Sequence, residues 1–365
     1  MESTETRLKN LRDRINKKYD GELSAMAGKI PKLKRFRSGS LELDLALGGG
    51  WPFNRTSLVY GPESSGKTTI LLRACSEVVN YCHTCKERYP CECEEFIPGS
   101  ALWIETEGSL DVKWAIQNGM DPEGNLVVWP LCGEDAINLI DTAIRENTVD
   151  LIILDSIEAT LPSKEIEDGA EKQNPGLHAR LMNKGFRKWT NGLTEKRGTG
   201  PALICVNQMR EKIGVMFGDP STLPGGKGQL FHPAIHLRNT KAKVHDAPGE
   251  AKSAYVEIHG TAHKNKTFTP KLEYTFHLAL LDYESRKAGK LLATYEAGEI
   301  NNIESLVKYG RKLDLIKVGA GVWKIDLPEA GVTLSAKGKD GLIKEFQNDL
   351  DAYEVFYAIV VGALT

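Results

Sequence analysis

Residues 61–69 carry a pattern that can bind the phosphates of a nucleotide. They read Gly-Pro-Glu-Ser-Ser-Gly-Lys-Thr-Thr, which fits G-x-x-x-x-G-K-T. The glycines let successive backbone N–H groups converge on the phosphates, the lysine reaches the β- and γ-phosphates, and the threonine hydroxyl binds Mg²⁺. A strand-like run at residues 56–60 precedes the loop and a helical pattern begins at Thr69, so we expect nucleotide binding rather than a glycine-rich turn without a ligand. The predicted contacts are Gly61, Pro62, Glu63, Ser64, Ser65, Gly66, Lys67, Thr68 and Thr69.

Acidic and amide side chains follow three other apolar runs. Asp155 ends the uninterrupted run at residues 151–154, which is typical of a strand buried on both faces. An acid at such a strand tip is placed to hold Mg²⁺ with Thr68, although it could instead cap a helix. Glu105 and Glu107 follow residues 102–104. Either carboxylate can orient an attacking water or be a solvated loop acid, and because alternation places both on one strand face, the pattern does not separate them.

An amide follows the apolar run at residues 202–206. Gln208 would stand at the tip of that strand, where it can contact a γ-phosphate and transmit its loss to the glycine-rich loop at residues 214–228. The alternative is an ordinary turn or capping residue.

Composition limits the class of protein. The 365 residues contain 47 Lys and Arg against 49 Asp and Glu, so any nucleic-acid site must be a local patch. No apolar run reaches the roughly 18–20 residues of a membrane span, and the N-terminus does not resemble a signal peptide. We therefore expect a cytoplasmic protein whose cysteines are thiols or metal ligands rather than disulfides.

The elements that must position these residues form three regions. Strands alternate with helices over residues 38–280, which predicts an α/β domain with a mostly parallel central sheet. Residues 1–37 are basic and mostly helical in pattern, with Leu8, Leu11 and Ile15 at helical spacing. This helix is either solvated or an arm whose apolar stripe docks on another subunit. Residues 281–365 predict a small C-terminal α/β domain.

These motifs together resemble the bacterial RecA recombinases over roughly residues 35–280. The resemblance depends on residues 37–44, residues 61–69, Glu107 with Asp111, residues 149–156, and above all the stretch N-Q-M-R-E-K-I-G-V-M-F-G-D-P at 207–220. It implies a RecA-like P-loop ATPase core, with the arm at 1–37 as a polymerisation element. The implied function is an ATP-dependent recombinase that forms a helical homo-oligomer on single-stranded DNA. Such a filament catalyses homologous pairing and strand exchange with double-stranded DNA, and its ATP hydrolysis depends on DNA. The alternative is a ring-forming RecA-fold ATPase, such as a helicase or a regulatory ATPase, which would not be expected to carry residues 208–220 as written.

The resemblance also assigns roles around ATP. Glu107 matches the family's water-activating glutamate, which decides between it and Glu105. Asp111 and Trp114 match positions that hold adenine, with Trp114 where the family usually has Tyr. Gln208 matches the glutamine that couples ATP to the DNA-binding loop.

Three further matches lie at the family's subunit interface. Lys264 and Lys266 match lysines that reach the neighbouring subunit's ATP, as an arginine finger does in trans. Phe231 matches an aromatic residue of that interface.

The resemblance also implies two DNA-binding loops in this chain, at about residues 168–176 and 209–226. The implied contacts are Arg180, Arg187, Met209, Arg210, Lys212, Ile213, Gly225, Gly226 and Lys227. The cations would bind phosphates and Ile213 would be an apolar wedge between bases. Without the resemblance, ordinary solvated surface is the commoner reading of such cations. Pro175 and Lys227 depart from the family's Met and Asn, and the C-terminus is apolar rather than acidic.

Residues 80–97 are an insert where the family has a short turn. They contain Cys82, Cys85, Cys91 and Cys93 in the spacing C-x₂-C-x₅-C-x-C, which can provide a tetrahedral thiolate site for structural Zn²⁺. His83 could replace one ligand. The alternative is four reduced thiols in a floppy loop. We expect the other three cysteines, Cys75, Cys132 and Cys205, to be ordinary buried thiols.

Overall fold

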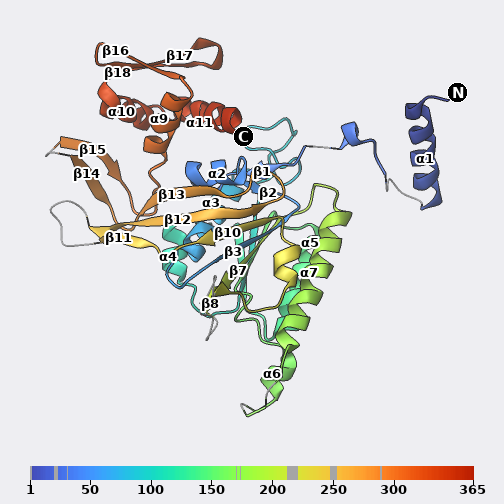
Figure 1. Ribbon diagram of the computed structural model, residues 1–365. Coiled ribbons are helices and arrows are strands. Elements are labelled where there is room, and N and C mark those ends of the chain that lie inside the picture. Colours follow the sequence, from blue (N-terminus) through green and yellow to red (C-terminus); the bar gives the residue numbers. More distant parts are fainter. Residues whose placement is uncertain are drawn as a thin grey trace. The chain divides into compact units, whose positions relative to one another are not determined.

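A computed structural model of the chain is shown in Figure 1, and it describes residues 2–19, 24–30, 32–169, 171–172, 174–211, 221–246, 253–287 and 290–365. The chain forms two compact units, Met1–Lys34 and Arg35–Thr365. Two predicted DNA contacts, Lys212 and Ile213, lie outside the described residues, as does about half of the predicted glycine-rich loop.

The elements have the following bounds. The helices are α1 (Thr4–Lys18), α2 (Leu41–Leu47), α3 (Lys67–Val78), α4 (Val112–Gln117), α5 (Gly133–Glu146), α6 (Ser163–Glu167), α7 (Leu177–Glu195), α8 (Gly228–Phe231), α9 (Asn302–Lys312), α10 (Gly338–Asn348) and α11 (Leu350–Leu364). The strands are β1 (Arg35–Phe36), β2 (Trp51–Pro52), β3 (Thr56–Gly61), β4 (Ala101–Glu105), β5 (Asn125–Val128), β6 (Leu151–Asp155), β7 (Ala202–Gln208), β8 (Arg210–Glu211), β9 (Ser221–Thr222), β10 (Ile235–Asn239), β11 (Lys243–Asp246), β12 (Ser253–Asn265), β13 (Leu272–Ala279), β14 (Tyr283–Lys287), β15 (Lys290–Tyr295), β16 (Ile316–Gly319), β17 (Val322–Leu327) and β18 (Val332–Lys337).

The N-terminal unit contains the basic helix α1. The Ser3 hydroxyl accepts a hydrogen bond from the Thr6 N–H and so caps the first turn, as N-cap serines commonly do. No residue of α1 is buried, and Leu8 and Leu11 are each almost half exposed. The expectation that residues 1–37 are mostly helical is wrong for the described residues after this helix, because among residues 24–30 and 32–37 the one helical segment is a short 3₁₀ turn at Ala27–Lys29, and Arg35–Phe36 is strand β1 of the second unit.

The second unit is built on a nine-stranded sheet. Its order is β11-β12-β10-β3-β7-β6-β4-β5, with β13 paired to β12. The six strands from β10 to β5 are parallel to their neighbours, whereas β11, β12 and β13 are joined by antiparallel pairings. Because parallel strands end at one edge, the loops after β3, β4, β6 and β7 meet there. The predicted α/β fold with a mostly parallel central sheet is confirmed.

Helices cover both faces of this sheet (Figure 1). Strand β6 shows why: Leu151 and Ile153 belong to the cluster that contains α3, whereas Ile152 and Leu154 belong to the cluster that contains α5 and α7. Alternate side chains of a strand point to opposite faces, so an uninterrupted apolar run supplies both clusters. Leu151–Asp155 is buried throughout, as the sequence predicts.

The C-terminal part contains the helices α9, α10 and α11. They share a third apolar cluster with the sheet β16-β17-β18, and Phe346 and Phe356 lie fully buried in it. All pairings in this sheet are antiparallel. The boundary expected near residue 280 stays a prediction, since Arg35–Thr365 forms one compact unit.

None of the helices within the described segments combines the length and the apolar character needed to cross a membrane.

Candidate nucleotide site, interface residues and metal centre

The phosphate-binding pattern lies between β3 and α3, at the edge where the parallel strands end. Helix α3 begins at Lys67, two residues earlier than Thr69, and no side chain caps its N-terminus. Gly66 at the N-cap has φ +76°, and a Cβ there would lie 2.6 Å from Ile258. Only glycine adopts this conformation without strain and fits this space. An uncapped helix N-terminus behind a tight turn is what phosphate binding requires.

Lys67 is held inside this loop. Its ammonium group donates to the carbonyl oxygens of Pro62 at 2.7 Å and Gly61 at 3.3 Å. Burial lowers the pKa of Lys67, and the carboxylates of Asp155 and Glu107 oppose this shift. The lysine therefore lies in a desolvated position beside two acids, where a phosphate would be its natural counterion.

Thr68 and Asp155 lie together, as a shared magnesium site requires. The Thr68 hydroxyl donates to Asp155 Oδ2 at 3.3 Å. Burial raises the pKa of Asp155 to about 7, with Glu107 and Glu105 adding to the shift. A buried carboxylate with other carboxylates nearby is stabilised by a cation, and Mg²⁺ prefers hard oxygen ligands of this kind. The residues present therefore fit Mg²⁺.

Glu105 and Glu107 differ in their surroundings. Strand β4 ends at Glu105, so the alternation that placed both acids on one face does not reach Glu107, and that expectation is wrong. Glu105 is buried, and its Oε1 accepts the N–H groups of Glu107 at 3.0 Å and Gly108 at 2.7 Å. Its Oε2 accepts the Trp103 indole N–H at 3.2 Å. Glu105 thus fixes the loop that carries Glu107.

Glu107 contacts the tips of two further strands. Its Oε1 accepts the Ser156 hydroxyl at 2.5 Å and the Gln208 amide Nε2 at 3.3 Å. Gln208, the predicted sensor, is therefore in direct contact with the predicted water-activating carboxylate. A change that moves one of these side chains must also affect the other.

Two residues that sequence analysis missed connect Gln208 to the second predicted DNA loop. Asn207, fully buried, donates to Gln229 Oε1 at 2.6 Å and to the carbonyl oxygen of Pro224 at 2.8 Å. Gln229 donates in turn to the carbonyl oxygens of Pro224 and Gly226. The only available signal was the N-Q dipeptide at 207–208, because nothing local marks Gln229 as its partner.

The two residues predicted to contact adenine lie at the start of α4. Asp111 caps this helix by accepting the Trp114 N–H at 2.8 Å, and the Trp114 side chain packs partly buried against the apolar cluster around α3. Their contact with a base stays a prediction.

The interface lysines lie toward the opposite edge of the sheet. Strand β10 pairs with β12 on one side and with β3 on the other. Lys264 of β12 pairs with His236 of β10, which pairs in turn with Leu58 of β3. The Lys266 N–H donates to Ala234, whose N–H donates to Thr56 at the start of β3. The phosphate loop begins at Gly61, which is three residues or roughly 10 Å beyond the level of Lys264 and five residues or roughly 16 Å beyond that of Lys266 along β3. These lysines therefore point away from the nucleotide site of their own chain.

Both lysines contact the segment around α8. Lys264 donates to the carbonyl oxygens of Leu230 at 2.9 Å and Pro233 at 2.7 Å, and Lys266 donates to that of Phe231 at 3.4 Å. Burial, with a contribution from Lys266, lowers the pKa of Lys264 to about 8. The Phe231 side chain is 67% exposed. The three predicted interface residues thus form one surface patch.

The described DNA-binding candidates lie on α7 and around β8 to α8. Arg180 and Arg187 are exposed on α7, and Arg210 pairs with Glu158. Lys227 is exposed, Met209 packs against the apolar cluster around α5 and α7, and the turn at Gly225–Gly226 has φ of +91° and +78°. Their DNA contacts stay predictions.

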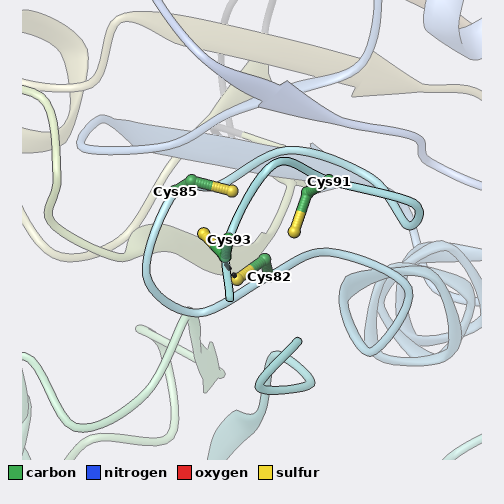
Figure 2. A group of neighbouring side chains, drawn as sticks. All are labelled: Cys82, Cys85, Cys91 and Cys93. Atoms are coloured by element: carbon green, nitrogen blue, oxygen red, sulfur yellow. Dashed lines mark hydrogen bonds between the residues drawn. The ribbon is translucent and has the colours of Figure 1, made fainter. Parts of the chain in front are cut away.

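The four insert cysteines converge on one point (Figure 2). Their sulfur atoms all lie within 4.8 Å of one another, and Cys82 Sγ is 3.8 Å from Cys93 Sγ. A tetrahedral zinc with Zn–S bonds of about 2.3 Å separates its sulfurs by about 3.8 Å, so this donor set fits Zn²⁺. His83 instead contacts Asp150 through Nδ1 at 3.0 Å. Among the other thiols, Cys75 and Cys205 are buried as expected, but Cys132 is only half-buried.

Substituting the two acids separately tests their different roles. Glu107→Gln should lower ATP turnover about a hundredfold or more while the stability of the protein stays near that of the original chain. Glu105→Gln should instead lower the free energy of unfolding by about 1–3 kcal/mol, because its amide oxygen can still accept the loop N–H groups but its NH₂ group then faces the buried Trp103 indole N–H, which loses its acceptor. Denaturant titration and a turnover assay on both variants check this, and equal loss of turnover at unchanged stability would contradict the assignment.

Comparison with known proteins agrees with this geometry. The family model for the RecA N-terminal domain matches residues 7–282. The chain is 36% identical over 278 residues to Protein RecA of Mesomycoplasma hyopneumoniae strain 7448, covering 75% of each chain. It is also 38% identical over 275 residues to Protein RecA of Mycoplasma mycoides, covering 74% of this chain and 73% of that one, and 32% identical over 323 residues to Protein RecA of Frankia casuarinae, covering 87% and 88%. The chain therefore belongs to the RecA family of recombinases.

Proposed function

We propose that this chain is an ATP-dependent recombinase that polymerises on single-stranded DNA and pairs it with a homologous duplex. One observation carries the proposal: Lys67, Thr68, Asp155 and Glu107 lie at one edge of the sheet, whereas Lys264 and Lys266 lie toward the other. A site divided in this way is completed by a second copy. Repetition of one such heterologous contact generates a filament unless the rotation closes a ring.

Each residue has a distinct part in hydrolysis. Lys67 neutralises the phosphates, Thr68 and Asp155 hold Mg²⁺, and Glu107 orients the attacking water. The Mg²⁺–ATP complex supplies the phosphoanhydride bond that is hydrolysed. Lys264 of a neighbouring copy stabilises charge on the transferred phosphoryl group. Gln208 donates to Glu107, so the presence of the γ-phosphate influences the loop that continues from β7.

Single-stranded DNA would bind the surface formed by that loop and α7. The exposed cations Arg180, Arg187 and Lys227 would contact phosphates, which supply most of the affinity in such complexes. Helix α1, with its exposed apolar residues, would act as the polymerisation arm.

The insert would hold one structural Zn²⁺ through its four cysteines. In the cytoplasm thiols stay reduced, and thiolates in tetrahedral geometry suit zinc. Metal analysis of protein purified without added metal should find one zinc per chain.

A strand-exchange assay tests the main proposal. Circular single-stranded DNA, homologous linear duplex, ATP and Mg²⁺ should yield exchanged products with this chain, and a heterologous duplex of the same length should yield none. DNA-stimulated ATP hydrolysis without any exchange would contradict the recombinase proposal and favour another RecA-fold ATPase.

A further inference from the structure

The cysteine insert contacts two distant parts of the molecule. Residues 82–98 are all described, and only Cys82 and Lys86 among them are buried. A segment with so little apolar burial does not fold by its own core. It nevertheless has a defined backbone: Cys82 N–H donates to Glu87 O, Lys86 N–H to Cys82 O, and His83 N–H to Ile97 O, all at 2.7–2.8 Å.

One contact joins the insert to the base of the central sheet. The Lys86 ammonium, 2% exposed, pairs with the Asp150 carboxylate, 1% exposed. Asp150 Oδ2 also accepts His83 Nδ1 and the Ser100 N–H, each at 3.0 Å. Asp150 immediately precedes β6, which ends at Asp155 of the magnesium site. Removing Lys86 from this position would leave a buried carboxylate without its counterion, which is a costly arrangement.

The other contact joins the insert to the C-terminal helix α11. Arg88 pairs with Glu354 through its two terminal guanidinium nitrogens, Nη1 and Nη2. Glu354 Oε2, which Arg88 Nη1 contacts, also accepts Arg37 Nη1 at 2.6 Å, and the Arg37 guanidinium lies 4.0 Å from the ring centre of Tyr357. Helix α11 is therefore held between residue 37 at the start of the core and the insert.

Both contacts depend on where the cysteines place the chain. Lys86 directly follows Cys85, and Arg88 lies three residues from Cys85 and three from Cys91. A metal ion bound by the four cysteines would therefore fix the positions of both Lys86 and Arg88. Without the metal ion, the mostly exposed insert would lose conformational entropy each time Lys86 and Arg88 reached their partners.

We propose that Zn²⁺ turns residues 82–97 into a clasp that fastens α11 to the ATPase core, so that attachment of this helix depends on the metal. The inference rests on the zinc proposed above and goes beyond it, because a zinc-stabilised insert need not control any other element. Its partners are this chain's own Asp150 and Glu354. The clasp is independent of whether the protein exchanges DNA strands.

Hydrogen exchange on the full-length protein tests the clasp. Zinc-loaded protein is compared with protein stripped by a chelator under reducing conditions, and α5 serves as the internal reference. Stripping should speed exchange in α11 about two- to fivefold, because the Arg88–Glu354 pair is partly exposed to solvent, with a smaller increase at the start of β6 and no change in α5. Unchanged exchange in α11 would overturn the clasp even if zinc is bound, and protein that neither contains nor binds zinc would overturn the metal site as well. Neither result bears on ATP hydrolysis or strand exchange.

Three substitutions separate the metal from the contacts. Cys93→Ser should lose zinc and reproduce the stripped pattern. Arg88→Ala should keep zinc yet speed exchange in α11 alone. Glu92→Ala, at an exposed position of the same insert, should change neither. Normal protection of α11 in a zinc-loaded Arg88→Ala protein would show that the insert does not fasten this helix.

Discussion

Replacing Lys67 by alanine is expected to lower ATP turnover at least about a hundredfold, since one preorganised charge at the transferred phosphate commonly contributes that much. Lys67 is buried between the loop carbonyl oxygens and Asp155, with no other described lysine bonded to that loop. A neighbouring cation is therefore not placed to substitute for it. Phosphate release at saturating ATP, with Mg²⁺ and single-stranded DNA present, measures the effect.

A matched control excludes loss of folding as the cause. Lys317→Ala removes an exposed lysine of β16 in the C-terminal part and should leave turnover unchanged. Thermal unfolding of both variants should lie close to that of the original chain. If the Lys67→Ala protein hydrolysed ATP within a few-fold of the normal rate, the proposed role of the phosphate loop in hydrolysis would be contradicted.

Replacing Lys264 by alanine is expected to reduce DNA-dependent turnover by a similar or larger factor, because cations supplied in trans typically contribute about 10³–10⁵ to such reactions. The phosphate loop of the variant remains intact, so each chain should still bind ATP. Loss of the contacts to Leu230 and Pro233 could disturb α8 locally. Lys264→Arg is therefore measured beside it, and it should recover part of the turnover by restoring the charge.

Mixing two inactive variants shows directly whether the lysine acts across an interface. A Lys67→Ala subunit still offers Lys264, and a Lys264→Ala subunit still offers its phosphate loop. In an equal, random mixture about one quarter of the heterologous interfaces contain both intact halves, so about a quarter of normal turnover should return. Turnover that stays at the level of the separate variants would contradict a site shared between subunits.

The sequence predicted the loop between β3 and α3 and the buried strand that ends at Asp155, because the signals for both are local. The spacing within 61–69 identifies the loop, and the apolar run before Asp155 identifies a buried strand. Cysteine spacing likewise predicted the convergence of four thiols. Strand alternation failed at Glu107 because β4 ends at Glu105, and an end of a strand is set by tertiary hydrogen bonds that local pattern does not reveal.

Contacts between residues far apart in the sequence were not predicted. Lys86 and Arg88 look like ordinary surface cations of a polar insert, yet they pair with Asp150 and Glu354, 64 and 266 residues away. These contacts depend on how the insert folds back on the core. The resemblance to a family gave no help here, because this insert lies outside the motifs that carry the resemblance.

Electron microscopy tests the central claim most directly. The protein is mixed with single-stranded DNA, Mg²⁺ and a non-hydrolysable ATP analogue, and the assemblies are imaged. Membership of the RecA family, together with a phosphate loop and lysines that lie at different ends of the strands, predicts open helical filaments that lengthen with the DNA. Discrete closed rings without filaments would contradict the recombinase and favour a ring-forming ATPase.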